Sequence, residues 1–130
     1  MTNDDIEKYA TTLYSRISET VILKRAIIES GNWQPERNKC HHNVTIWCDY
    51  NPEFKPARGW LYFEQNSLRF ARFVAHSAII TPKGEIRDIT PSNASKDYPF
   101  ILSGLSEDEY AAILETIEGG ELHCKKKEKL

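Results

Sequence analysis

A long stretch of the chain, residues 69–81 (RFARFVAHSAIIT), is apolar at alternate positions and also at most positions between them. Successive side chains of a β-strand point to opposite faces, so a strand over this stretch has two mostly apolar faces. One face carries Phe70, Arg72, Val74, His76, Ala78 and Ile80, and the other carries Ala71, Phe73, Ala75, Ser77 and Ile79. Such a strand must be covered on both sides. We therefore expect it to be central in its sheet.

The sequence after this stretch predicts a turn and a return strand over residues 85–90. A three-residue turn pairs Thr81 with Glu85 and puts Asp88 on the face of the sheet that carries His76. A two-residue turn puts Asp88 on the opposite face, unless a bulge intervenes. The proline that opens the turn favours the three-residue form.

Helical periodicity is clear toward both ends of the chain. Apolar residues recur at three- and four-residue spacing from Asp4 onward, which predicts an amphipathic helix. The helical periodicity then becomes indistinct. Residues 21–29 could either continue the helix or form a separate element such as a strand. Near the other end, Ser106 and Glu109 form a capping box that opens a helix, which is expected to end at a Gly-Gly pair.

Together these patterns predict an α+β fold. We expect an N-terminal helical region and a central helix packed on a small antiparallel sheet, followed by a C-terminal helix. A strand over 59–64 and a short apolar element over 98–102 complete the expected elements. The 130 residues are expected to form one globular domain over 1–120, and the lysine-rich residues 121–130 a basic, flexible tail.

Charge and hydropathy argue against two classes of protein. The net charge is −2, whereas a dedicated nucleic-acid-binding protein usually carries a large positive excess. No window approaches the ~20 apolar residues of a membrane span, and the acidic, polar N-terminus is unlike a signal peptide. We expect a cytoplasmic protein, or one exported without a cleavable signal peptide, that binds neither nucleic acid nor membrane.

The three cysteines, Cys40, Cys48 and Cys124, form neither a disulfide framework nor a repeated metal-binding pattern. Cys48 is expected in the core and Cys124 in the exposed tail. Cys40 opens the central helix, which is expected over residues 40–50. The unpaired N–H groups there favour a thiolate and lower the pKa of a thiol. Taken alone, a free cysteine is more often a small buried hydrophobic residue than a nucleophile.

The adjacent residues Cys40, His41 and His42 also suggest a metal site. Neighbouring residues of a helix point about 100° apart, so these side chains cannot easily converge on one ion. A zinc site would need His76 or His123 to join them. We therefore predict no metal and no organic cofactor.

Acyl chemistry by a thiol needs a nucleophile, an imidazole, a group that orients the imidazole and donors for the oxyanion. Cys40 is the candidate nucleophile, His76 the general base and acid, and Asp88 the orienting group. The backbone N–H of Cys40 and the side-chain amide of Gln34 are the candidate oxyanion donors. The candidate substrate-contacting residues are Trp33, His41 and Trp60.

The order of these residues resembles that of the papain-like superfamily of cysteine enzymes, which includes transglutaminase-like and peptidoglycan-amidase-like members. There a cysteine opens a helix packed on a small antiparallel sheet, and a histidine and an acid follow in neighbouring strands, as Cys40, His76 and Asp88 do here. Gln34 stands six residues before the cysteine, where papain-type members carry an oxyanion donor. Asp88 begins an Asp-Ile-Thr sequence similar to the Asp-Xaa-Thr of transglutaminase-like members. The resemblance implies a compact papain-like fold and a thioester intermediate.

We therefore expect a small cysteine-dependent enzyme that acts on an amide or related acyl bond, as an amidase, deamidase, peptidase or acyl or amine transferase. Its partner would be a protein, a peptide or a small amide substrate. The chain is short for a protease with a two-lobed cleft, which favours a compact amidase, deamidase or transferase. The alternative is a non-catalytic adaptor or inhibitor that binds a protein through the surface from Trp60 to Phe73.

Overall fold

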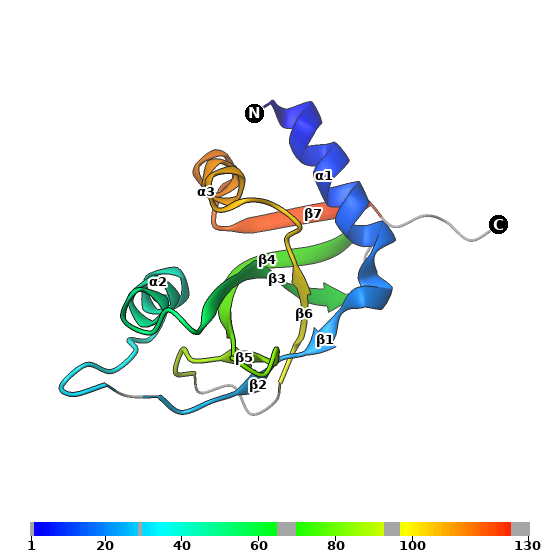
Figure 1. The fold of residues 1–130 in the computed structure, drawn as a ribbon. Coiled ribbons are helices and arrows are strands. Elements are labelled where there is room, and N and C mark those ends of the chain that lie inside the picture. The colour runs from blue at the N-terminus through cyan, green and yellow to red at the C-terminus, as the bar shows by residue number, and fades with distance from the viewer. Residues whose placement is uncertain (1, 29, 65–69, 93–96, 126–130) are drawn as a thin grey trace.

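The computed structural model describes residues 2–28, 30–64, 70–92 and 97–125. Within these residues the protein is mixed α+β, with three α-helices and a mostly antiparallel sheet (Figure 1). The helices are α1 (Asn3–Ser15), α2 (Cys40–Tyr50) and α3 (Glu107–Thr116), and a short 3-10 helix, η1 (Ile17–Glu19), follows α1. The strands are β1 (Val21–Ile22), β2 (Lys24–Arg25), β3 (Lys55–Glu64), β4 (Phe70–Ile80), β5 (Ile86–Asp88), β6 (Pro99–Leu102) and β7 (Glu121–Lys125).

The described strands form one curved sheet in the order β1-β6-β3-β4-β5-β2, and β7 also pairs with β4. All pairs are antiparallel except β2 with β5. The first and last strands of this order, β1 and β2, are separated in the chain only by Leu23. The sheet therefore curves round until its two edges meet at that residue (Figure 1).

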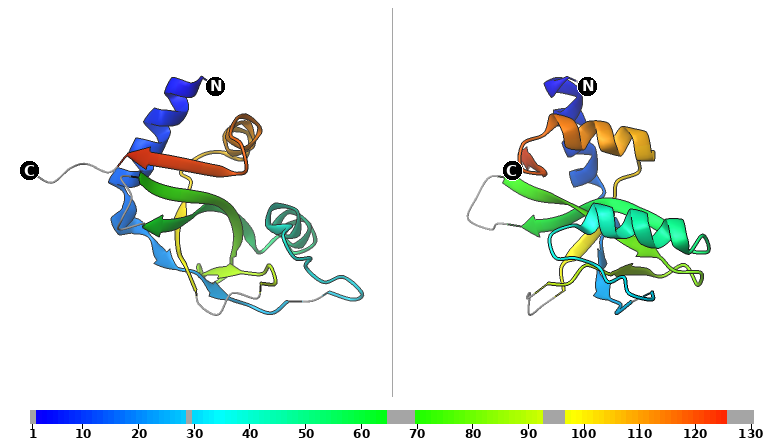
Figure 2. Two further views of the ribbon diagram at one scale, coloured as in Figure 1. Left: turned by 180° about the vertical axis from the view of Figure 1, so that it is seen from behind. Right: turned by 90° about the vertical axis from the view of Figure 1, so that its left-hand side faces the viewer.

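Strand β4 is central, as its two apolar faces predict, because it pairs with β3, β5 and β7. On the inner face of the curve Ala78 packs in a cluster with Phe100. On the outer face Phe73 is covered by α1 and α3, and Ile79 is covered by α2 (Figure 2). The core is thus divided between the inside of the curved sheet and two clusters beneath the helices.

The turn between β4 and β5 determines which face carries the candidate acid. The Thr81 N–H donates to the Glu85 carbonyl at 2.8 Å, and the strand pairing continues in that register. Gly84 has φ +83°, the left-handed conformation that closes such a turn with little steric cost. The three-residue turn is therefore confirmed, and it places Asp88 on the same face as His76.

Helix α2 has both of its expected boundaries, whereas α3 begins where expected but ends at Thr116, before the predicted stop at Gly119-Gly120. The central helix α2 runs from Cys40 to Tyr50. The capping box of α3 is present, since Ser106 Oγ accepts from the Glu109 N–H at 3.1 Å and Glu109 Oε1 accepts from the Ser106 N–H at 2.9 Å. Local capping chemistry and apolar periodicity were sufficient to predict these elements.

The region left open by the sequence, residues 21–29, begins as the two short strands β1 and β2 and not as more helix. Helix α1 ends at Ser15, and Thr2 caps its start with Oγ1 accepting from the Asp5 N–H at 3.1 Å. Strand β1 pairs with β6, and strand β2 pairs with β5. Both partners are distant in sequence, so local periodicity does not reveal these strands.

The prediction of a flexible tail is wrong for residues 121–125. These residues form β7, in which Leu122 and Cys124 are buried against the cluster beneath α1 and α3. Cys124 is accordingly not exposed. The sequence did not predict this strand because the alternation of apolar and polar residues covers only five positions and runs into the lysine-rich end of the chain. Residues 126–130, and Arg69 of the predicted central strand, lie outside the described residues.

Candidate active site

Cys40 is the first residue of α2, and its side chain is half-buried. Lys39 precedes it without making a side-chain cap, so the first-turn N–H groups of α2 attract negative charge. Burial raises the pKa of the Cys40 thiol, but hydrogen bonds with the imidazoles of His41 and His76, together with their charges, lower it to about 5. The thiol is therefore largely ionised at neutral pH.

His76, in β4, interacts both with this thiol and with Asp88 of β5. His76 Nε2 lies 3.1 Å from Asp88 Oδ1, although the ring N–H is not aligned for a hydrogen bond to that oxygen, so the contact is best described as an ion pair. Burial lowers the pKa of His76, but the interactions with Asp88 and with the Cys40 thiol raise it to about 9. Thiolate and imidazolium thus stabilise each other.

The Asp88 carboxylate accepts a hydrogen bond from the backbone just after β5, and the main chain of Asp88 is paired with β2. Its Oδ1 atom accepts a hydrogen bond from the Thr90 N–H at 3.1 Å. On the other side Arg25 of β2 pairs with Asp88, and the Ala26 N–H donates to the Asp88 carbonyl at 2.8 Å. The N-terminal part of the chain therefore supports the strand that carries the acid.

Cys40, His76 and Asp88 line one cavity of about 910 Å³. Its wall combines charged and apolar side chains, among them Arg25, Arg37, Asp97, Leu61, Val74 and Tyr98. The structure therefore brings the three predicted catalytic side chains to a common space with both polar and apolar surface.

His41 also interacts with the Cys40 thiol and is held by residues of the sheet. His41 Nδ1 lies 2.6 Å from Ser77 Oγ, and Arg58 Nη1 donates to the same oxygen at 2.9 Å. Because a guanidinium only donates, the Ser77 hydroxyl oxygen accepts from Arg58, and the same hydroxyl forms the hydrogen bond with His41 Nδ1. His41 lines a separate cavity of about 330 Å³. His41 is not among the residues that line the cavity containing Cys40, and its contact with substrate stays a prediction.

Asn43 is a residue that the sequence analysis missed. It is fully buried on α2, where its Oδ1 accepts from the Glu36 N–H at 3.0 Å and its Nδ2 donates to the Glu36 carbonyl at 2.7 Å and to Thr90 Oγ1 at 3.0 Å. The sequence contains one indication that Asn43 is buried. Asn43 stands directly before Val44 and one turn before Trp47, and both of these are core residues. A buried polar group needs such partners.

Gln34 is exposed in the loop before α2 and is not among the residues that line the cavity containing Cys40. Arg37 and Asn38 of the same loop line it instead. Asn38, two residues before α2 begins, has φ +61°, a left-handed conformation that asparagine tolerates. The oxyanion role of Gln34 stays a prediction, and the N–H groups at the start of α2 are the other candidate donors.

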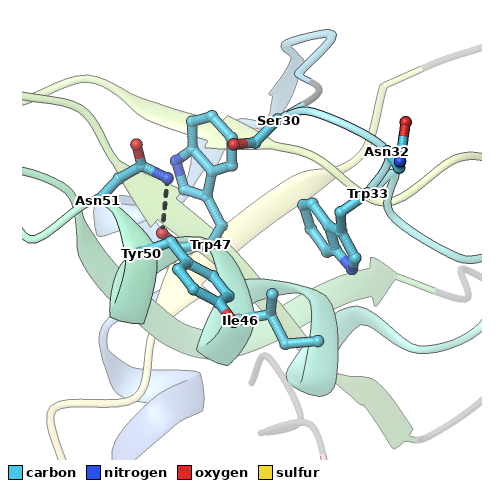
Figure 3. A pocket seen from close by; sticks show the side chains of 7 residues that line it. All are labelled: Ser30, Asn32, Trp33, Ile46, Trp47, Tyr50 and Asn51. Carbon is cyan, nitrogen blue, oxygen red and sulfur yellow. Dashed lines mark hydrogen bonds between the residues drawn. The ribbon is translucent and has the colours of Figure 1, made fainter.

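Trp33 lies at a different cavity, of about 580 Å³, near the C-terminal end of α2 (Figure 3). Its ring stacks with that of Trp47, with centroids 6.4 Å apart and planes inclined by 26°. Ile46 and Tyr50 of α2 complete the apolar part of this wall. Trp33 is thus at the opposite end of the helix from Cys40 and does not line the cavity that holds the thiol.

The prediction that Trp60 contacts substrate is wrong, because Trp60 is 0% exposed. Its Nε1 donates to the Tyr9 hydroxyl at 2.9 Å, and its ring packs against that of Tyr110. Phe73 is also 0% exposed, so the surface expected for an adaptor is buried at both of its ends. Helices α1 and α3 cover this face of β3 and β4, which the strand alternation alone could not indicate.

In residues 2–28, 30–64, 70–92 and 97–125, no three or more His, Cys, Asp or Glu side chains are grouped so that they could hold a metal ion. Across the same ranges, no helix combines the length and the apolar character that a membrane crossing requires.

Comparison with known protein families, with curated proteins and with solved structures finds no match for this chain. A fold does not by itself specify an activity, which depends on the geometry and chemistry of the site.

Proposed function

We propose that this protein is a cysteine-dependent enzyme that acts on an amide or related acyl bond through Cys40, His76 and Asp88. The observation that carries the proposal is that a thiol at a helix start and an imidazole–carboxylate pair line the same cavity. The order of these residues along the chain supports a compact papain-like arrangement, which is part of the proposal.

In the first half-reaction the Cys40 thiolate attacks the carbonyl carbon of the substrate, and the carbonyl π electrons move onto oxygen. The N–H groups at the start of α2 stabilise the resulting oxyanion. When the tetrahedral intermediate collapses, the C–N bond breaks and the His76 imidazolium gives its proton to the departing amine. A thioester then joins the acyl group to Cys40.

In the second half-reaction neutral His76 takes a proton from water or from an acceptor amine, which attacks the thioester carbonyl. The C–S bond breaks, the Cys40 thiolate departs and the imidazolium is restored. Water gives a carboxylic acid, and an amine gives a new amide. Asp88 keeps the imidazole oriented and stabilises its positive charge throughout.

The volume of the cavity falls within the range of sites for small-molecule ligands. A volume of about 910 Å³ lies near the top of the ~300–1,000 Å³ range of small-molecule sites. Arg25 and Asp97 provide polar contacts on its wall. An amidase, a deamidase or a transferase of a small group is compatible with this volume.

The first test is selective alkylation of the folded protein. With iodoacetamide at about pH 6, we expect Cys40 to react about tenfold or more faster than Cys48 and Cys124, because burial raises the pKa of both other thiols. Mass spectrometry of the digested protein identifies the labelled residue. Cys40→Ala should abolish this label, and Cys48→Ala should retain it.

Equal labelling of the three thiols, or labelling only after unfolding, would contradict the proposal and favour a non-catalytic binding protein. The role of His76 is tested in the same assay. His76→Ala is expected to fold and to lose most of the rapid labelling at pH 6, because the imidazolium that stabilises the Cys40 thiolate is absent.

A further inference from the structure

Asn43 joins the segments that make up the proposed active site. It lies on α2 one turn after Cys40 and is fully buried. Its amide makes hydrogen bonds of 2.7–3.0 Å to Glu36 and Thr90. Glu36 belongs to the loop before the nucleophile, and Thr90 follows the strand that carries Asp88. One side chain thus connects the helix, the loop and the acid-bearing segment.

The orientation of this amide follows from its backbone partner. The Glu36 N–H only donates, so the atom that faces it at 3.0 Å must be Asn43 Oδ1. Nδ2 then donates both of its protons, to the Glu36 carbonyl at 2.7 Å and to Thr90 Oγ1 at 3.0 Å. Fully partnered buried amides are rigid, because in a low-dielectric environment each lost hydrogen bond is costly.

Thr90 contacts both the Asn43 amide and the Asp88 carboxylate, so it connects the two residues. The Thr90 N–H donates to Asp88 Oδ1 at 3.1 Å, and the same oxygen lies 3.1 Å from His76 Nε2. A displacement of Thr90 would therefore move the carboxylate oxygen that faces the imidazole.

We infer that Asn43 is a positioning residue, whose amide holds the helix bearing Cys40 at a fixed separation from the Asp88–His76 pair. The inference rests on the proposed function. Asn43 transfers no proton, and its buried amide lies outside the residues that line the cavity. Its contribution is geometric, and displacements of about 1 Å in reacting groups are enough to cost about 100-fold in rate.

Two nearly isosteric variants test this role. Asn43→Asp keeps the shape but lacks both N–H donors and repels the Glu36 carbonyl oxygen. Thr90→Val keeps the backbone N–H to Asp88 but lacks the hydroxyl that receives the Asn43 amide. For each, we expect alkylation of Cys40 by iodoacetamide at about pH 6 to slow about tenfold or more. We also expect the midpoint of its pH profile to rise by about one unit.

Two controls separate positioning from general stability. Thr90→Ser retains the hydroxyl and should restore the wild-type profile. Asn51→Ala removes an amide at the far end of α2, where Nδ2 donates to the Trp47 carbonyl at 3.0 Å, and should leave the profile of Cys40 unchanged. If Asn43→Asp does not fold, Thr90→Val decides on the same criteria.

Two outcomes would overturn the inference. One is that Cys40 is alkylated at the wild-type rate in both test variants. The other is that the variants have a lower Tm but an unchanged pH profile of Cys40 alkylation. Either result would leave the proposed function standing if Cys40 of the wild-type protein still reacts selectively. Loss of selectivity in the wild-type protein itself would instead overturn the proposed function, so the two failures are distinguishable.

Discussion

A thiolate and an imidazolium in contact titrate as a linked pair. The pKa of Cys40 is lowered to about 5 and that of His76 is raised to about 9, so both charges are present between these pH values. We expect acyl transfer to increase through about pH 5 as the thiolate forms. It should decrease through about pH 9, as the imidazolium loses the proton required by the leaving group. The increase through about pH 5 is measured directly by the rate at which iodoacetamide labels Cys40 as a function of pH.

A variant at the imidazole provides the control for this profile. In His76→Gln the thiol loses a hydrogen-bonding partner and a positive charge, so the midpoint for Cys40 should move from about pH 5 toward the ordinary thiol value. The labelling profile of Cys48 should not change. An unchanged Cys40 midpoint would show that the imidazole does not stabilise the thiolate.

Replacement of Ser77 should lower the stability of the fold. It is fully buried, and its hydroxyl is shared by Arg58 Nη1 and His41 Nδ1. Ser77→Ala leaves both groups without this partner and should lower the free energy of unfolding by about 1–3 kcal/mol. Urea denaturation measures the loss. Ser15→Ala, at an exposed helix position, is the control and should change stability by less than about 0.5 kcal/mol.

At the scale of single elements, β7 should contribute to the core. Leu122 is 3% exposed in the cluster beneath α1 and α3, whereas its neighbour His123 is exposed. Leu122→Ala should lower the free energy of unfolding by about 2–5 kcal/mol, because it removes buried methyl groups and leaves a cavity. His123→Ala should have little effect. Equal, small effects of both changes would contradict the place of β7 in the sheet.

The elements that the sequence predicted well are those with local signals. The boundaries of α2, the capping box at Ser106 and the turn after Thr81 each depend on a few neighbouring residues. The register of β4 with β5 followed from the turn, and with it the shared face of His76 and Asp88. Turn chemistry and the two-residue period of strands were sufficient for these features.

The features that the sequence could not give depend on distant partners. Strands β1 and β2 have two residues each and exist because β6 and β5 lie beside them. The alternation of β3 placed Trp60 on one face, but only the packing of α1 and α3 decides that this face is buried. Asn43 was overlooked for the same reason, since Thr90, one of its partners, is far away in the sequence.

At the scale of the whole molecule, the candidate site draws on segments from both halves of the chain. Cys40 begins a helix that packs on β4, the acid lies on β5, and β5 is flanked by β2 from the N-terminal region. Strand β5 has only three residues, so its position depends on both neighbouring strands. We therefore expect the site to form only when β2 and β4 both flank β5.

The meeting of the two sheet edges at Leu23 has a consequence for the order of assembly. Parallel pairing of β2 with β5 closes a long loop of chain, a slow step compared with forming a helix or a hairpin. During refolding from denaturant, enhanced nucleophilicity at Cys40 should accordingly emerge after most helical content has returned.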